Sequence, residues 1–151
     1  MTRQIFATAT VLAVLGISSI GCRSVTQPEG ASFASVVIKG RMGAETRAAT
    51  VAVFQEDGYT PLGVGMTEFV FQKEGSKMNK VAYGNWVGGP AVYVRVKVQL
   101  VVVSPGVDRL QCKAYMVRNQ GDSFFEEDIK LSNVHRRPYQ DLLNQVAKRL
   151  K

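Results

Sequence analysis

The most regular pattern in the chain is an alternation of apolar and polar side chains over residues 92–103. Every second residue there is aliphatic, starting with Val92, and a period of two over this length is typical of a β-strand with one wet face. Residues 104–108 (SPGVD) predict a turn, after which the alternation resumes over residues 109–118. These two segments are therefore predicted to form an antiparallel hairpin.

Two other segments repeat their apolar residues at helical intervals. Residues 44–57 predict a helix that ends at Gly58, because glycine readily adopts the left-handed conformation of a C-terminal cap. We expect the buried stripe of this helix to be formed by Ala44, Ala48, Val51, Ala52 and Gln55. Residues 137–151 predict a second helix, with Pro138 in its first turn. The apolar stripe of this second helix comprises Tyr139, Leu142, Leu143, Val146, Ala147 and Leu150.

Shorter apolar runs complete the predicted fold. Residues 33–40 and 66–73 predict strands, the second with Phe69 and Phe71 on one face, and residues 123–131 predict an edge strand or a short connection. This order predicts the α+β class: a two-layer sandwich whose mostly antiparallel sheet of four or five strands carries two helices on one face. The opposite face of such a sheet must lie in water or against a partner.

The N-terminal segment has a different character. A basic Arg3 is followed by 16 uncharged residues, Ile5–Ile20, and by the small residue Gly21, which together form the pattern of a secretory signal. The apolar run is shorter than the ~18 to 20 residues that a spanning helix needs. We therefore expect a signal peptide over residues 1–21. The remaining chain, of 151 residues and 46% apolar side chains in all, then has room for a single domain over residues 33–151.

The end of this run, Ser19-Ile20-Gly21-Cys22, resembles the lipobox of bacterial lipoproteins. The resemblance implies cleavage before Cys22, attachment of diacylglycerol to its thiol, and a tether over residues 22–32 that joins the lipid to the domain. Arg23 resembles the default, outer-membrane class of these lipoproteins, so the expected location is the cell envelope, facing the periplasm. The alternative is an ordinary cleaved signal or an uncleaved anchor, with Cys22 incidental.

The charge of the chain adds a candidate binding face. Lys and Arg number 19 and Asp and Glu 12, a formal net charge of +7. Part of this excess alternates with aromatic residues on the polar side of the predicted hairpin. The candidate binding face comprises Tyr93, Arg95, Lys97, Arg109, Lys113 and Tyr115. Such a face could bind anionic lipid headgroups or acidic polymers, or single-stranded nucleic acid if the chain is not exported. The alternative is that these charges only keep an exposed sheet soluble.

A second candidate for binding is the glycine-rich segment of residues 75–90, which joins two predicted strands. A long connection inside a compact domain is often functional. Tyr83 and Trp86 in this segment could present aromatic rings to a partner or to the bilayer surface. The alternative is that Trp86 folds back and caps the core.

Signals of catalysis are nearly absent from the sequence. One His and two Cys are too few for a Cys/His zinc cluster, and we expect neither a metal nor a cofactor. Glu126, Glu127 and Asp128 are adjacent, so their side chains point apart, and a solvated acidic turn is expected. His135 is expected on the surface, and Cys112 as a buried structural thiol. The sequence therefore predicts a protein that is not an enzyme.

The order of elements over about 33–150 resembles two lipoprotein groups of the Gram-negative envelope. One is the LptE-like subunit of the lipopolysaccharide-transport translocon, and the other is the helix-grip-like domain of the BamC-like lipoproteins of outer-membrane assembly. The likeness lies in element order without shared motifs, so it implies a fold and a compartment but no functional residue.

Three functional hypotheses follow from these observations. The first is a lipid-anchored, non-enzymatic envelope protein, held in the membrane by its N-terminal diacylglycerol, that acts as an accessory or binding module for a protein partner or an anionic glycolipid. The second is a small exported ligand-binding or enzymatic domain, with a pocket between sheet and helices lined by Tyr59, Trp86, Cys112 or Tyr139. The third is nucleic-acid binding by the basic face, which export would make unlikely.

Overall fold

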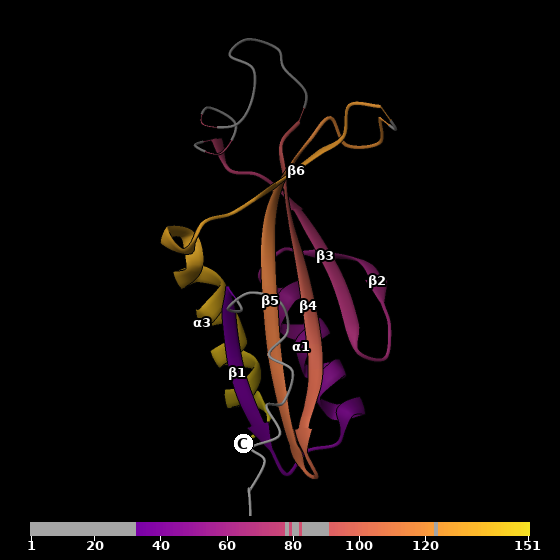
Figure 1. Ribbon diagram of the computed structural model, residues 1–151, viewed down its shortest axis with the longest axis vertical. Coiled ribbons are helices and arrows are strands. Elements are labelled where there is room, and N and C mark those ends of the chain that lie inside the picture. Colours follow the sequence, from indigo (N-terminus) through magenta and orange to yellow (C-terminus); the bar gives the residue numbers. More distant parts are fainter. Residues whose placement is uncertain (1–32, 78, 80–81, 83–90, 123) are drawn as a thin grey trace, which may run out of the picture.

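A computed structural model describes residues 33–77, 79, 82, 91–122 and 124–151. Its described part contains six strands and two α-helices, arranged as one sheet with both helices on the same face (Figure 1). This arrangement confirms the predicted α+β class. The elements are β1 (Ala34–Lys39), α1 (Gly43–Glu56), β2 (Thr60–Val64), β3 (Glu68–Glu74), β4 (Tyr93–Ser104), β5 (Val107–Arg118), β6 (Glu127–Lys130), a 3₁₀ turn (Asn133–His135) and α3 (Arg136–Arg149).

The sheet is built around the predicted hairpin of β4 and β5. Its strand order is β1-β5-β4-β3-β2, every pairing is antiparallel, and β6 also pairs with β5. β1 pairs with β5 from Val107 to Cys112, and β6 pairs with it from Tyr115 to Arg118. β1 and β6 therefore lie end to end along the same edge of β5.

The core lies between the sheet and the two helices. The aliphatic residues of β4 from Val94 to Leu100 are buried there, as are the alternate residues of β5 from Leu110 to Met116. The rings of Phe69 and Phe71 on β3 complete this side of the sheet, and both are fully buried. The alternation in the sequence thus marks the helix-covered face of the hairpin, as predicted.

The predicted helix over residues 44–57 is present as α1, but its predicted buried stripe is wrong. Ala44, Ala48 and Gln55 are exposed, and Val51 and Ala52 are only half-buried. The residues that α1 buries are Thr46, Ala49, Thr50, Val53 and Phe54. Phe54 decides the orientation, because its ring stacks on Phe71 with centroids 4.4 Å apart. The apolar spacing did not predict this buried side, because two of its five residues are threonines.

The end of α1 follows the prediction, and the strand after it was missed. Gly58 has a φ of +85°, and the N–H of Tyr59 donates to the carbonyl oxygen of Phe54 at 3.0 Å, which closes the helix. β2 then begins at Thr60 and pairs with β3. Pro61 is tolerated there because β2 is an edge strand, where one side of the backbone needs no ladder partner.

α3 covers the other half of the sheet, against β1 and α1. Its buried residues are Tyr139, Leu142, Leu143 and Val146, all members of the predicted stripe. The side chain of Gln140 reaches the outer edge of β1. Its Oε1 accepts the N–H of Ser35 at 3.2 Å, and its Nε2 donates to the Ser35 carbonyl oxygen at 2.9 Å. One amide side chain therefore satisfies both backbone groups of an edge residue.

We predict that Thr46→Val stabilises the protein. Thr46 is fully buried, and among the described residues its hydroxyl has no hydrogen-bond partner. Removing an unsatisfied buried hydroxyl should raise the free energy of unfolding by about 1 kcal/mol. Urea denaturation measures this change.

The matched control is Thr50→Val, which lies one turn further along α1. The Thr50 hydroxyl donates to the Thr46 carbonyl oxygen at 2.7 Å, so the same substitution removes a made hydrogen bond and should bring no gain. Equal gains in both variants would show that the gain comes from the valine methyl group and not from removal of an unsatisfied hydroxyl.

Candidate binding face of the sheet

The helix-free face of the hairpin carries all six residues of the predicted binding face. Arg95 on β4 lies opposite Tyr115 on β5, and Lys97 lies opposite Lys113. Tyr93 is at the start of β4 and Arg109 is near the start of β5, each on the same side of its strand as the others. All six side chains are half-buried. The structure therefore brings them onto one surface, although their environments differ.

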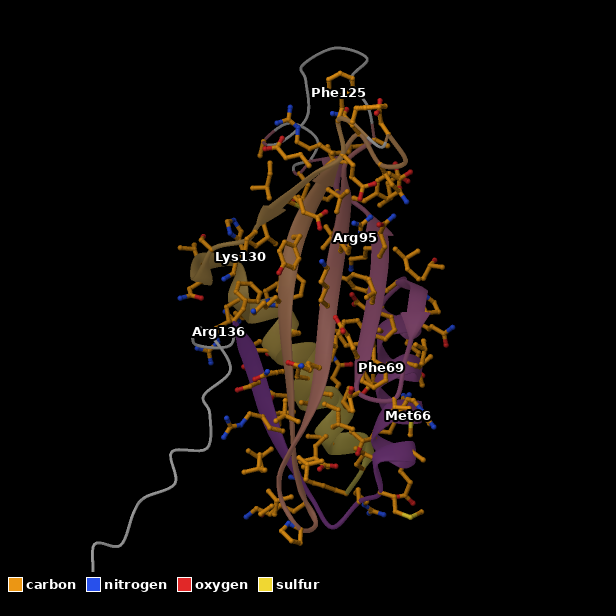
Figure 2. The ribbon with its side chains drawn as sticks, turned by 45° about the vertical axis from the view of Figure 1, so that its right-hand side comes forward. Met66, Phe69, Arg95, Phe125, Lys130 and Arg136 are labelled. Carbon is orange, nitrogen blue, oxygen red and sulfur yellow. The ribbon has the colours of Figure 1, made fainter. Side chains whose placement is uncertain are left out.

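Arg95 is occupied by contacts within the protein. Its Nε and Nη2 donate to the Oε1 of Gln72 on β3 at 3.2 and 3.1 Å. Its Nη1 donates to the Oε1 of Glu126 at 2.8 Å and to the Oδ1 of Asp128 on β6 at 3.2 Å. These four residues form the Arg95 network, which joins β3, β4 and β6 across β5 (Figure 2 labels Arg95). Val117, which pairs with Asp128 on β6, is fully buried on the same face.

The acidic residues Glu126, Glu127 and Asp128 are exposed, as predicted, but two of them belong to a strand rather than a turn, and they form ion pairs that the sequence analysis did not predict. The N–H of Gly121 and the guanidinium of Arg95 both donate to the Glu126 carboxylate, and together they lower its pKa below the usual range. Glu127 points the other way, with its Oε2 3.6 Å from a guanidinium nitrogen of Arg118. The pairing of Arg95 with Glu126 could not be predicted from the sequence, because the two residues are 31 positions apart in the chain.

The two opposed lysines lie beside this network. The Lys97 ammonium is 3.7 Å from the Oδ2 of Asp128 and 5.0 Å from the centroid of the Tyr115 ring. Lys113 and Arg109 have no carboxylate partner among the described residues. Like charges directly opposite one another on a sheet repel. An anion held between Lys97 and Lys113 would relieve that repulsion.

An uncharged pair separates Lys113 from Arg109. Gln111 lies between them on β5, and its Nε2 donates to the Oε1 of Gln99 at 3.0 Å. Gln111 is buried although it lies on the helix-free face. The free positive charge therefore falls at two positions along β5, one near the middle of the strand and one near the hairpin turn.

The other sequence candidates differ in their environments. Cys112 is buried, and burial raises the pKa of its thiol to about 12, so it is a structural side chain and no nucleophile. His135 is exposed, as expected. The described residues hold no group of three His, Cys, Asp or Glu side chains that could bind a metal. Cys22, Tyr83 and Trp86 lie outside the described residues.

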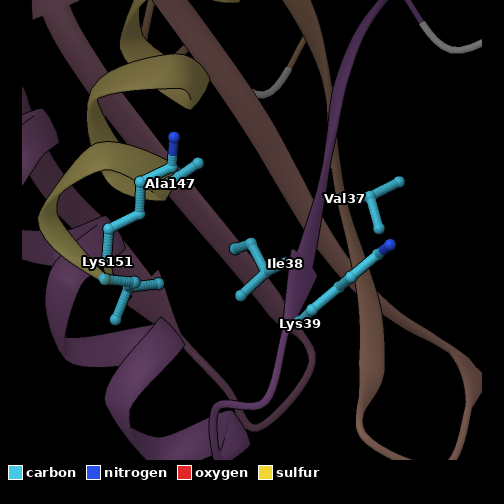
Figure 3. Close-up of a pocket in the computed structure, with 6 residues that line it drawn as sticks. Val37, Ile38, Lys39, Ala147 and Lys151 are labelled. Atoms are coloured by element: carbon cyan, nitrogen blue, oxygen red, sulfur yellow. The ribbon is translucent and has the colours of Figure 1, made fainter.

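The residues proposed to line a pocket between sheet and helices are members of the core. Tyr59, Cys112 and Tyr139 are buried in one hydrophobic cluster, and a side-chain hydrogen bond joins the two tyrosines. A pocket of about 230 Å³ lies elsewhere, between the edge of β1 and the end of α3 (Figure 3). It is lined by Val37, Ile38, Lys39, Ala147, Leu150 and Lys151.

No protein-family model and no curated protein matches the chain. Among solved structures, the adenylate sensor from AMP-activated protein kinase, in complex with 5-aminoimidazole-4-carboxamide 1-beta-D-ribofuranotide, is similar to it. The two are 21% identical, with a TM-score of 0.45, and the match covers 76% of this chain and 93% of that one. A likeness of this extent carries no argument about function.

We predict that Arg95 contributes to stability and that Arg109 does not. The Arg95 side chain is only 14% exposed, and Arg95→Met would leave Gln72, Glu126 and Asp128 without its donors. Hydrogen bonds to charged groups contribute about 1.5–3 kcal/mol, so a loss of that order in the free energy of unfolding is expected. Arg109→Met, the matched control, should change it by less than about 0.5 kcal/mol. Urea denaturation of both variants compares them, and equal losses would contradict a structural role for the network.

Proposed function

We propose that the chain is a lipid-anchored, non-enzymatic protein of the cell envelope that binds an anionic group on its helix-free sheet face. The group would belong to a glycolipid or to a protein partner. One observation carries the binding part of the proposal: Lys113 lies directly opposite Lys97 and has no carboxylate partner within the described part of the chain. Two ammonium groups held on rigid, neighbouring strands are suited to a phosphate or carboxylate.

The surroundings of the lysine pair support binding rather than solubility alone. Both strands are central in the sheet, so the backbone positions of the two lysines are fixed and binding has to restrict only their side chains. The Tyr115 ring holds the Lys97 ammonium by a cation–π contact, which keeps this cation at the surface. Asp128 neutralises Lys97 only in part, since their closest atoms are 3.7 Å apart.

The envelope location rests on the N-terminal sequence. The Ser19–Cys22 pattern supports attachment of diacylglycerol at Cys22, and the proposed site of action is the periplasmic face of the outer membrane. Within the described residues, no helix has the length and apolar character needed to cross a bilayer.

Nucleic-acid binding by the same basic face is the second candidate function, and it would require that the N-terminal segment is no export signal.

Lipid labelling tests the anchor. The full-length chain, expressed in a Gram-negative host with a radiolabelled or alkyne-tagged fatty acid, should incorporate the label. Cys22→Ala should abolish incorporation, because the thiol is the only proposed attachment point. Cys112→Ala is the matched control and should keep the label, since that thiol is buried. Label that survives Cys22→Ala, or none in the unaltered protein, would contradict the anchor.

Charge reversal tests the binding face. Lys113→Glu should weaken binding to purified lipopolysaccharide or to phosphatidylglycerol vesicles by about five- to thirtyfold, given about 1 kcal/mol per unit of charge near an anionic surface. Arg137→Glu makes the same change in charge on the exposed side of α3, away from this face, and should have little effect. Equal weakening by both variants would show that net charge alone drives binding. Binding is measured by flotation or light scattering at several salt concentrations.

A further inference from the structure

The connection between β5 and β6 presents two adjacent phenylalanines to solvent. Phe124 is 92% exposed and Phe125 is 69% exposed. Phe125 lies at one end of the long axis of the molecule, whereas Met66 lies towards the other end (Figure 2). We call the two phenylalanines the aromatic tip. Exposed large apolar residues that occur together, rather than singly, are typical of an interaction site.

The aromatic tip is held outward by a set of hydrogen bonds in its own loop. The Oδ1 of Asp122 accepts the N–H groups of Phe124 and Phe125 at 3.0 and 3.3 Å. Asn119, in the left-handed region with a φ of +52°, donates from its Nδ2 to the Phe125 carbonyl oxygen at 3.0 Å. The outward position of the rings is therefore built into the loop. The backbone N–H groups of both phenylalanines and the Phe125 carbonyl oxygen are already paired, so these groups add less to the cost of moving the rings out of water than unpaired ones would.

The same loop is fastened to the sheet by Glu126. Its Oε2 accepts the N–H of Gly121 at 3.0 Å, while its Oε1 accepts from Arg95 on β4 at 2.8 Å. The N–H of Glu126 itself donates to the Asp122 carbonyl oxygen at 2.9 Å. The Arg95 network thus connects the loop that carries the tip to the centre of the sheet.

The place where the tether joins the domain lets the tip reach the membrane that carries the anchor. The described chain starts at Phe33, and the next residue, Ala34, pairs with Cys112 on β5. The end of β5 at Arg118 is six residues further along, or roughly 20 Å. The eleven residues 22–32 can span at most about 36–40 Å when fully extended. The lipid at Cys22 and the aromatic tip can therefore meet one bilayer.

We propose that the aromatic tip inserts into the interface of the bilayer to which Cys22 is anchored, so that the sheet stands upright on the membrane. This inference rests on the anchor of the proposed function. Phenylalanine is suited to the boundary between headgroups and acyl chains. The charges near the tip select the kind of lipid, because Asp122 adds a negative charge beyond the paired carboxylates of Glu126 (with Arg95) and Glu127 (with Arg118). The tip therefore prefers a zwitterionic surface, in contrast to the basic face of the sheet, which prefers an anionic one.

The test uses the full-length, lipidated chain in phosphatidylcholine vesicles that contain a spin-labelled phospholipid quencher. Gln120, an exposed residue of the same loop, is changed to cysteine and labelled with an environment-sensitive nitrobenzoxadiazole dye. Cys112 is buried and stays unlabelled. We expect the dye at position 120 to be quenched at least twofold. The matched control carries the dye at position 66 (Met66→Cys, native side chain 82% exposed) and should be unquenched.

Removing the rings separates insertion from simple proximity. Phe124→Ser with Phe125→Ser should reduce quenching at position 120 to the level at position 66, while the chain still floats with the vesicles through its lipid. Flotation without quenching at position 120 would overturn the tip proposal and leave the anchor intact. Failure of the unaltered protein to float would overturn the anchor instead. Quenching that requires phosphatidylglycerol would assign the contact to the basic face and would also overturn the tip proposal.

Discussion

Every other element of this fold depends on the pairing of β4 with β5. Each strand has 12 residues, and both alternate between a helix-covered side and an open side. β3 attaches to one edge of the hairpin, and β1 and β6 share the other. Because α1 and α3 both cover the same face, no helix of the described chain packs on the opposite face. That face is stabilised by interactions among its own polar side chains.

The Arg95 network stabilises this helix-free, open face. A guanidinium has five donors in a fixed plane, so Arg95 can hold Gln72 on one side and Glu126 and Asp128 on the other. The charge of Arg95 is paired with the carboxylates of Glu126 and Asp128, whereas Lys113 and Arg109 on β5 have no carboxylate partner among the described residues. The open face is therefore divided into a structural end near β6 and a free basic region along β5.

The predictions from the sequence succeeded where one physical signal dominated. The hairpin and α3 were predictable because large aliphatic residues repeat at the strand or helix period. The buried side of α1 was not, because Thr46 and Thr50 lie on it while three exposed or half-buried alanines imitate an apolar stripe. The six residues of the candidate face were correctly placed on one surface by strand parity alone. The neutralisation of Arg95 could not be predicted from the sequence, because it depends on the register between β5 and β6 and on a carboxylate 31 residues away.

The hydrogen bonds from Gln140 to β1 have a consequence for association between copies of the chain. In an antiparallel sheet the backbone groups of every second residue point to the same side, so Ser35, Val37 and Lys39 all face the outer edge. An uncovered edge of this kind recruits strands from other molecules and leads to aggregation. The Gln140 amide pairs with the backbone of the first of these three residues. The charged side chain of Lys39, the last of the three, disfavours pairing with a strand of another molecule. Along β1 only the single position Val37 remains open, which is too short for a strand of another molecule to pair with this edge of the sheet.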